Sequence, residues 1–252
     1  MAVMPQDYIL KRRLNDSIVF QGINKTGYGG RGVFLKGLDY EPELALLPYF
    51  LSKDSVFIDI GANTGIYSMV AASLLTNGTV ISFEPFPLMS SYLLKNVVQN
   101  RFGNVRLRTF GISNETSGKK FYMNSDIPTS FSFSREVNGA TAVELFTMKL
   151  DDAVKMENLD RIDYIKIDAE GEELKIVEGA LDVIKKFRPI IQLELMYGEL
   201  RKNNAYKIID GYRIFSSKEK SDNKLYIPEE SDKIKIAQSL GMLEIKEESI
   251  PA

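Results

Sequence analysis

The sequence predicts an α/β fold, a mostly parallel, Rossmann-like sheet with helices on both of its faces. From Ser55 onward, short apolar runs alternate with amphipathic segments, a pattern typical of buried strands connected by helices. A glycine-containing loop follows the first apolar run, at the strand end where open α/β sheets bind ligands. Two closely spaced apolar runs near the C-terminus indicate an antiparallel ending. We therefore expect five parallel strands followed by antiparallel ones.

The expected strands share two features, a short apolar core and a neighbouring Gly, Pro, Asn, Asp or Ser that turns the chain. In chain order, the five parallel strands are expected at Val56–Ile60, Thr79–Phe83, Val105–Phe110, Tyr164–Ile167 and Ile190–Leu195. The antiparallel pair is expected at Tyr212–Phe215 and Lys224–Ile227.

Apolar residues at helical spacing predict the helices between these strands. They are expected at Ile66–Leu75, at about Leu88–Asn100, at Glu172–Phe187 and near Leu200–Ile209. The first is apolar on most faces and begins directly after Gly65, so it is predicted to be a buried helix that opens at the glycine loop. The third carries a clear apolar stripe and is ended by Pro189.

The chain length of 252 residues, with 44% apolar and 26% charged residues, fits one globular α/β domain with elaborations. Residues 1–48 are predicted to form an N-terminal cap, and residues 49–252 the main domain. Glycines cluster between Gly22 and Gly37 in the cap, which favours tight hairpin turns over a phosphate loop, because no Lys-Ser/Thr ending follows them.

An inserted hairpin at about residues 111–140 is predicted to interrupt the alternation of strands and helices. Hydroxyls and rings alternate within it over Thr129–Ser134, so Phe131 and Phe133 share one face of an expected strand. Packing on the sheet is favoured for this strand, and lining a substrate site is the alternative.

Charge and hydropathy exclude several partners. The 32 basic and 34 acidic residues give a formal charge of −2, which offers no electrostatic reason to bind nucleic acid or an anionic membrane. No run approaches the roughly 18 apolar residues that span a bilayer, and Met1–Leu10 lacks the apolar stretch of a signal peptide. We therefore expect a cytoplasmic protein without membrane insertion.

The chain contains no Cys and no His. Disulfides, thiolate zinc sites, cysteine nucleophiles, Ser-His-Asp hydrolysis and HExxH zinc proteases are therefore excluded. Proton transfer must use Asp, Glu, Lys or Tyr side chains.

The loop after the first strand predicts a nucleoside-binding site. Asp59 precedes Gly61 and Gly65, and Glu84 ends the second strand 19 residues after Gly65, the place from which a carboxylate reaches a ribose. A nicotinamide site would prefer Gly-x-Gly-x-x-Gly, but Asn63 and Ile66 occupy its second and third glycine positions. S-Adenosylmethionine has no phosphate and carries a sulfonium and an ammonium, charges that suit Asp59. An NAD-dependent oxidoreductase and a non-catalytic cofactor-binding scaffold are the alternatives.

Four segments together resemble the FkbM-type methyltransferases. They are the Asp-Ile-Gly-Ala-Asn-Thr-Gly of Asp59–Gly65, the Ser-Phe-Glu-Pro of Ser82–Pro85, the Lys-x-Asp-x-Glu-Gly-x-Glu of Lys166–Glu173 and the Arg-Pro-Ile-Ile-x-x-Glu of Arg188–Glu194. Leu150-Asp151-Asp152 also matches a Leu-Asp segment of the family. The resemblance spans about Ser55 to Leu195, and its most distinctive part is Lys166–Glu173.

This resemblance implies a seven-stranded class I methyltransferase fold and methyl transfer to a hydroxyl on a sugar, glycan or secondary metabolite such as a polyketide. By position, the methionine part of the cofactor would be held by Asp59, Gly61, Asn63, Thr64 and Gly65. Glu84, with Pro85 beside it, would bind the ribose hydroxyls, and the segment Gly111, Ile112 and Ser113 would lie near the adenine. Asp168 is a further expected cofactor neighbour.

The carboxylates after the fourth strand are the candidate catalytic groups, because methyl transfer to an alcohol needs alignment and a departing proton. Asp168 is the first candidate for general base or orienting group, and Glu170 is the second. Lys166 shares strand parity with Asp168 and is predicted to modulate these charges, a structural ion pair being the alternative.

A divalent metal held by Asp168, Glu170 and Glu194 is a secondary hypothesis, since oxygen ligands suit Mg²⁺ and Ca²⁺. S-Adenosylmethionine is the expected cofactor, and a hydroxyl-bearing small molecule or glycan is the expected partner.

Overall fold

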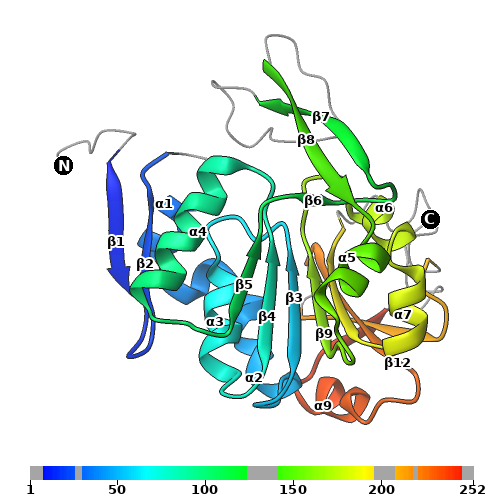
Figure 1. The fold of residues 1–252 in the computed structure, drawn as a ribbon. Coiled ribbons are helices and arrows are strands. Elements are labelled where there is room, and N and C mark those ends of the chain that lie inside the picture. The colour runs from blue at the N-terminus through cyan, green and yellow to red at the C-terminus, as the bar shows by residue number, and fades with distance from the viewer. Residues whose placement is uncertain (1–7, 26–29, 124–140, 196–207, 218–220, 246–252) are drawn as a thin grey trace.

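The computed structural model describes residues 8–25, 30–123, 141–195, 208–217 and 221–245. Its centre is an eight-stranded sheet in the order β13-β11-β12-β10-β9-β3-β4-β5 (Figure 1). The five strands that pair in parallel are β3 (Val56–Ile60), β4 (Thr79–Phe83), β5 (Val105–Arg108), β9 (Tyr164–Ile167) and β10 (Ile190–Glu194). The α/β class and the parallel strands are confirmed.

The remaining strands form the antiparallel ending, in which β12 (Asn223–Pro228) pairs with both β10 and β11 (Tyr212–Ser216). A short strand that the sequence pattern did not indicate, β13 (Leu243–Ile245), pairs with β11 and makes eight strands instead of seven. Helix α9 (Lys233–Ser239), also not predicted, precedes it.

Two apolar layers cover the two faces of the sheet. One face packs against α5 (Leu150–Glu157), α6 (Glu173–Glu178) and α7 (Leu181–Phe187). The other packs against α3 (Ile66–Leu74), α9 and the N-terminal segment. Because side chains alternate along a strand, Ile58 and Ile60 belong to the first layer while Phe57 belongs to the second.

Helices α6 and α7 correct the expected single helix from Glu172 to Phe187. The helix is interrupted at Gly179, where a Cβ atom would lie 2.1 Å from the backbone oxygen of Ser113. The Gly179 oxygen accepts a hydrogen bond from the Asp151 amide at 3.0 Å. The break therefore comes from a tertiary contact with distant backbone. Most of the helix expected near Leu200–Ile209 lies outside the described residues.

The N-terminal segment contains β1 (Ile9–Arg13), β2 (Val19–Ile23), α1 (Gly30–Lys36), the 3₁₀ helices η1 (Gly37–Tyr40) and η2 (Pro42–Leu46), and α2 (Leu47–Phe50). The β1–β2 hairpin lies beside α4 (Pro87–Gln99) (Figure 1). Buried Asn96 of α4 donates hydrogen bonds to the backbone oxygens of Gln21 and Thr64, both at 2.9 Å. This one side chain ties the hairpin to the loop after β3.

The glycines of this segment do not serve the predicted hairpin turns at Gly22, Gly30 or Gly32. Gly22 lies within β2, whereas Gly30 and Gly32 lie in α1. A Cβ at Gly22 would lie 2.7 Å from the Gly30 Cα, so these glycines let β2 and α1 pack closely.

The insertion forms a three-stranded sheet in the order β6-β8-β7, which stands above the main sheet in Figure 1. Its strands are β6 (Gly111–Ile112), β7 (Ser117–Met123) and β8 (Thr141–Met148), and β7 and β8 pair antiparallel. The predicted hairpin is thus present, but it continues to Met148 and is joined by β6. The strand expected at Thr129–Ser134, with Phe131 and Phe133, lies outside the described residues.

Across the described part of the chain, no helix combines the length and the apolar character needed to cross a membrane.

Candidate functional site

The loop after β3 lies against the end of β9. Gly61 has φ +74°, and a Cβ there would lie 1.8 Å from the backbone oxygen of Asp168, so only glycine allows this approach. The amides of Gly61 and Ala62 donate to the Phe83 oxygen at 3.0 and 3.1 Å. The ends of β3, β4 and β9 therefore meet at one point.

Glu84, directly after β4, holds this loop in shape. Its Oε2 accepts a hydrogen bond from the Asn63 amide at 2.7 Å, and its Oε1 accepts one from the Phe86 amide at 2.8 Å. The residue is only 6% exposed. Asn63 has φ +50°, a left-handed conformation that Asn adopts more readily than most residues. The carboxylate is thus fixed before any ligand binds.

Asp59 lies beneath the loop, fully buried at 0% exposure. Ser68 donates a hydrogen bond to its Oδ2 at 2.5 Å, and the Lys166 ammonium lies 4.0 Å from its Oδ1. Its Oδ1 has no hydrogen-bond partner within the described residues. Burial raises the pKa of Asp59, an effect that Lys166 and Ser68 oppose.

Lys166 also pairs with Asp168, as strand parity predicted, with 2.9 Å between Nζ and Oδ2. Its ammonium lies 4.8 Å from the centre of the Tyr67 ring, a cation–π distance. Burial lowers the pKa of Lys166, but Asp168 and Asp59 outweigh it and raise the pKa above its ordinary value. The lysine is therefore a permanent cation between two carboxylates.

The turn after β9 explains the spacing of the Lys166–Glu173 motif. Glu170 and Gly171 have φ +52° and +98°, and their left-handed backbone reverses the chain. The Glu173 Oε1 accepts hydrogen bonds from the amides of Ala169 at 2.8 Å and Gly171 at 3.2 Å. The Glu173 side chain thus braces the turn that carries Asp168 and Glu170.

A cavity of about 290 Å³ opens where these loops meet. The predicted residues that line it are Gly61, Asn63, Thr64, Glu84, Pro85, Gly111, Ile112, Lys166, Asp168, Glu170 and Glu194. Residues far apart in the sequence are thus brought to one place, at the carboxyl ends of the parallel strands.

Three predicted site residues do not line the cavity, and each has a supporting position instead. Asp59 is fully buried, where it accepts a hydrogen bond from Ser68 and lies 4.0 Å from the Lys166 ammonium. Gly65 caps α3 with φ +89° and packs against Leu93. Ser113 is buried, and its hydroxyl donates to Glu172 at 2.8 Å.

Several residues on the cavity wall were not predicted. They are Val33, Tyr40 and Glu41 of the N-terminal segment, together with Ile60, Ala62, Ile66, Tyr67, Phe83, Phe86, Met89, Phe121, Ala169 and Glu172. For Phe86 and Tyr67, closeness to the Glu84 and Gly65 motifs was an available signal. No motif connects Tyr40 and Glu41 to the cavity, because their position depends on how the N-terminal segment folds over the sheet.

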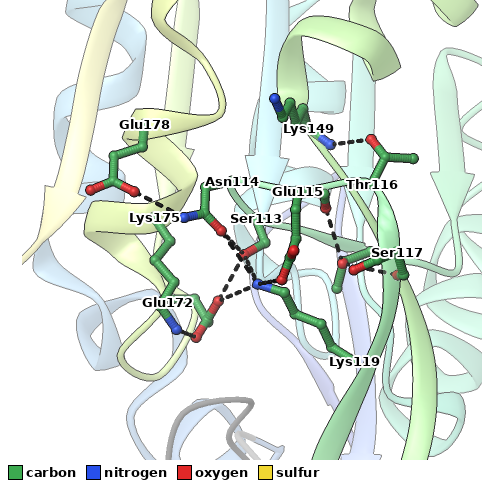
Figure 2. A network of polar contacts seen from close by, with 11 residues as sticks. Ser113, Asn114, Glu115, Thr116, Ser117, Lys119, Lys149, Glu172, Lys175 and Glu178 are labelled. Atoms are coloured by element: carbon green, nitrogen blue, oxygen red, sulfur yellow. Dashed lines mark hydrogen bonds and ion pairs between the residues drawn. The ribbon is translucent and has the colours of Figure 1, made fainter.

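The insertion is fastened to α6 by a polar network around Glu172 (Figure 2). The Glu172 carboxylate is 1% exposed and accepts hydrogen bonds from Ser113 at 2.8 Å and from Lys175 at 2.7 Å. Lys119 of β7 donates to the Ser113 hydroxyl at 2.7 Å and lies 3.7 Å from Glu172. Lys119 also pairs with the more exposed Glu115 at 3.3 Å. These contacts hold β7 and its cavity-lining Phe121 in place.

Asp168 and Glu194 form a hydrogen-bonded carboxyl pair at the ends of β9 and β10. Burial raises the pKa of Asp168, but Lys166 and a hydrogen bond with Glu194 outweigh it and bring the pKa below its usual value. Burial and the Asp168 charge raise the pKa of Glu194 to about 9. At neutral pH, Asp168 is ionised and protonated Glu194 donates to it.

Three other cavity carboxyls titrate near neutrality. Burial is the largest cause in each case and raises the pKa of Glu41, Glu84 and Glu170 to about 7. Asp168 and Glu173 raise the pKa of Glu170 further by repulsion. The cavity therefore takes up protons readily and favours a bound cation, which would stabilise the ionised carboxylates.

These pKa values predict that Glu84 makes the ligand-free protein less stable as pH rises. The stabilisation from a buried acid with a raised pKa is fully present below the pKa that the acid has in the unfolded chain. It is lost as pH rises through the pKa that the acid has in the folded protein. For a pKa that rises from 4.5 to about 7, wild type should lose about 2 kcal/mol of unfolding free energy relative to Glu84→Gln between pH 5 and pH 7. Urea unfolding of both proteins measures this difference, and parallel pH profiles would show that Glu84 does not titrate in this range.

Among the described residues, no three acidic side chains are grouped so that they could hold a metal ion. Asp168, the central member of the hypothetical set, already pairs with Lys166.

The strand order and the cavity define the class of protein. A parallel sheet with an antiparallel ending, a glycine loop after β3 and an acid after β4 form the Rossmann-like methyltransferase fold. The chain belongs to the FkbM methyltransferase family, because the sequence profile described as "Methyltransferase FkbM domain" matches residues 59–217. The predicted family is confirmed.

Similar proteins support this assignment. The hexuronic acid methyltransferase AglP of Haloferax volcanii is 23% identical over 139 residues, which cover 55% of each chain. The methyltransferase sdnD of Sordaria araneosa is 22% identical over 159 residues, covering 51% of this chain and 61% of that protein. The chain thus spans little more than half the length of these relatives.

A solved structure shares the fold. The FkbM methyltransferase of Methylobacillus flagellatus superposes with a TM-score of 0.50 and 18% sequence identity, covering 70% of this chain and 44% of that one.

Proposed function

We propose that this methyltransferase uses S-adenosylmethionine to methylate a hydroxyl group on a sugar, glycan or secondary metabolite. The observation that carries the proposal is the carboxylate-lined cavity, in which Glu84 is fixed at the end of β4. The neighbouring loop after β3 lacks the glycine fingerprint for a pyrophosphate. Acids suit a ligand that carries a sulfonium and an ammonium, and they do not suit phosphates. Similarity to a hexuronic acid methyltransferase supports a sugar among the acceptor classes.

The residues on the cavity wall fit this cofactor. The two amides that hold Glu84 leave lone pairs of its carboxylate for the ribose hydroxyls. Gly111 and Ile112, beside Phe86 and Phe121, offer apolar surface for the adenine. The Gly61–Thr64 loop and Asp168 would face the methionine part. When bound, S-adenosylmethionine supplies an electrophilic methyl group on a positively charged sulfur.

The chain's own residues would align the acceptor and take its proton. Asp168 makes hydrogen bonds with Lys166 and Glu194, which fix its carboxylate. A fixed carboxylate suits orientation of the acceptor hydroxyl. Glu170 lines the same cavity, and its pKa of about 7 matches a general base that works at neutral pH. In the transfer, Glu170 would receive the proton that the acceptor hydroxyl loses, while Asp168 would hold that hydroxyl in line with the methyl group that the cofactor supplies.

Calorimetry and labelled methyl transfer test this proposal together. We expect the protein to bind S-adenosylmethionine and S-adenosylhomocysteine but not NADH, and to transfer labelled methyl groups to hydroxyls in a panel of sugars, glycolipid precursors and secondary metabolites. Turnover should be the same with and without EDTA. Binding of NADH instead would favour an oxidoreductase, and cofactor binding without any transfer would favour a non-catalytic scaffold. Absence of S-adenosylmethionine binding would contradict the proposal.

A further inference from the structure

The cavity has two sides that follow from the strand order. Glu84 follows β4 and Gly111 follows β5, on one side of the loop after β3. Asp168 follows β9 and Glu194 ends β10, on the other side of that loop. We call the side with Glu84 and Gly111 the nucleoside side, and the side with Asp168 and Glu194 the β9–β10 side. Because neighbouring strands lie about 4.8 Å apart, the two sides are separate regions of one cavity.

Tyr40 and Glu41 of the N-terminal segment lie on the β9–β10 side. The charges that act on Tyr40 are those of Glu41, Asp168, Glu170 and Glu194, and those acting on Glu41 include Lys166 and Asp168. The backbone of Glu41 is held by hydrogen bonds to Leu38 and from Leu44. The backbone of Glu41 is therefore fixed at the edge of the cavity by the fold of the N-terminal segment.

The Glu41 carboxylate has no hydrogen-bond partner in the described parts of the chain, although it lines the cavity. Tyr40 is 37% exposed and also lines it. An aromatic ring beside a carboxylate is an arrangement that suits a polyhydroxylated ring, whose apolar face packs on the aromatic ring while its hydroxyls donate to the carboxylate.

The charges on this side argue against an anionic acceptor. Lys166 is the one cationic side chain that the described residues place on the cavity wall, and it already pairs with Asp168 at 2.9 Å and lies 4.0 Å from Asp59. Within the part of the chain that the structure describes, an acceptor carboxylate or phosphate would thus lie among Glu41, Asp168 and Glu170 without a counter-ion of its own. A cationic acceptor would lie next to the sulfonium, which repels it.

We infer that Tyr40 and Glu41 form the acceptor subsite on the β9–β10 side, and that the subsite takes an uncharged polyhydroxylated ring such as a neutral sugar. The inference rests on the proposed methyl transfer. It assigns a specificity role to the N-terminal segment, which contributes the adjacent residues Tyr40 and Glu41 to the cavity wall.

Matched acceptors test the charge requirement. Labelled methyl transfer from S-adenosylmethionine is measured on methyl glycosides, on the corresponding glycosiduronates and on the 2-amino-2-deoxy glycosides. We expect transfer to uncharged glycosides at least about 10-fold faster, in kcat/KM, than to the charged ones. If the protein binds S-adenosylmethionine but methylates the uronates or amino sugars better, or methylates no uncharged glycoside, the inference is wrong. If it does not bind S-adenosylmethionine, the proposed function itself fails.

Glu41→Gln and Tyr40→Leu test the two residues. Each should raise the acceptor KM about 10-fold or more, because the acceptor loses its contact with the Glu41 carboxylate or the Tyr40 ring. The affinity for S-adenosylmethionine should stay within twofold, since neither residue is on the nucleoside side. Glu41→Lys should shift the preference towards the uronate. The matched control is Asp39→Asn, because Asp39 is an exposed acid of η1, the 3₁₀ helix that ends at Tyr40, and does not line the cavity. Unchanged acceptor KM in both variants would overturn the assignment.

Discussion

Glu170→Gln is expected to lower kcat about 100- to 10,000-fold, the range for loss of a general base. The reason is the environment of Glu170 on the turn braced by Glu173, where burial and the Asp168 charge place its pKa at about 7. Protonated Glu170 accepts no proton, so wild-type kcat should fall at low pH, with a midpoint below the ligand-free pKa of about 7 because the bound sulfonium stabilises the ionised carboxylate. The variant should lack this acid limb. Measurement at saturating concentrations of cofactor and acceptor removes the effect that titration of Glu84 and Glu41 has on binding.

The control is Glu178→Gln, a change of the same kind at the exposed end of α6, where the side chain accepts a hydrogen bond from Asn114 at 3.0 Å. It should keep wild-type kcat, and both variants should keep their affinity for S-adenosylmethionine.

Asp168→Asn distinguishes which of the two carboxylates, Asp168 or Glu170, is the base. If Glu170 is the base, removal of the Asp168 charge moves the acid limb to lower pH, because a neighbouring anion no longer raises the pKa of Glu170. If Asp168→Asn abolishes turnover while Glu170→Gln keeps it, Asp168 is the base.

The parallel part of the sheet could be predicted because each strand is a local, apolar run between turn residues. Val56–Ile60, Thr79–Phe83 and Tyr164–Ile167 form strands with the predicted bounds. The cavity residues after these strands could also be predicted, since residues that follow parallel strands meet at one sheet edge whatever lies between them. Lys166 and Asp168 share a face because side chains two residues apart on a strand point the same way.

The features that escaped prediction depend on contacts between distant segments. The break between α6 and α7 exists because Gly179 packs against Ser113, a contact that helical periodicity does not encode. Asp59 carries the acidic position typical of a cofactor loop, but the register of β3 with β4 and β9 places it between Ser82 and Lys166, beneath the cavity. Tyr40 and Glu41 reach the cavity only through the packing of the N-terminal segment on the sheet.

Glu84→Ala is expected to weaken S-adenosylmethionine binding at least about 100-fold, measured by calorimetry at pH 8. Two effects add. The ribose loses its charged hydrogen-bond acceptor, and each such bond is worth about 1.5 to 3 kcal/mol. The Asn63 and Phe86 amides also lose the carboxylate that fixes the loop, at 2.7 and 2.8 Å, so part of the binding energy must order the loop.

The pH dependence of binding distinguishes this role from simple damage to the fold. Since the pKa of Glu84 is about 7 without ligand and the ionised carboxylate is the stronger acceptor, wild-type affinity should rise as pH increases from 6 to 8, with protons released on binding. Glu84→Gln should bind weakly and release fewer protons than wild type. The matched control Glu178→Gln should show the wild-type pH dependence. Wild-type affinity in Glu84→Ala, in a protein that unfolds cooperatively, would remove Glu84 from the cofactor site and return the loop after β3 to a purely structural role.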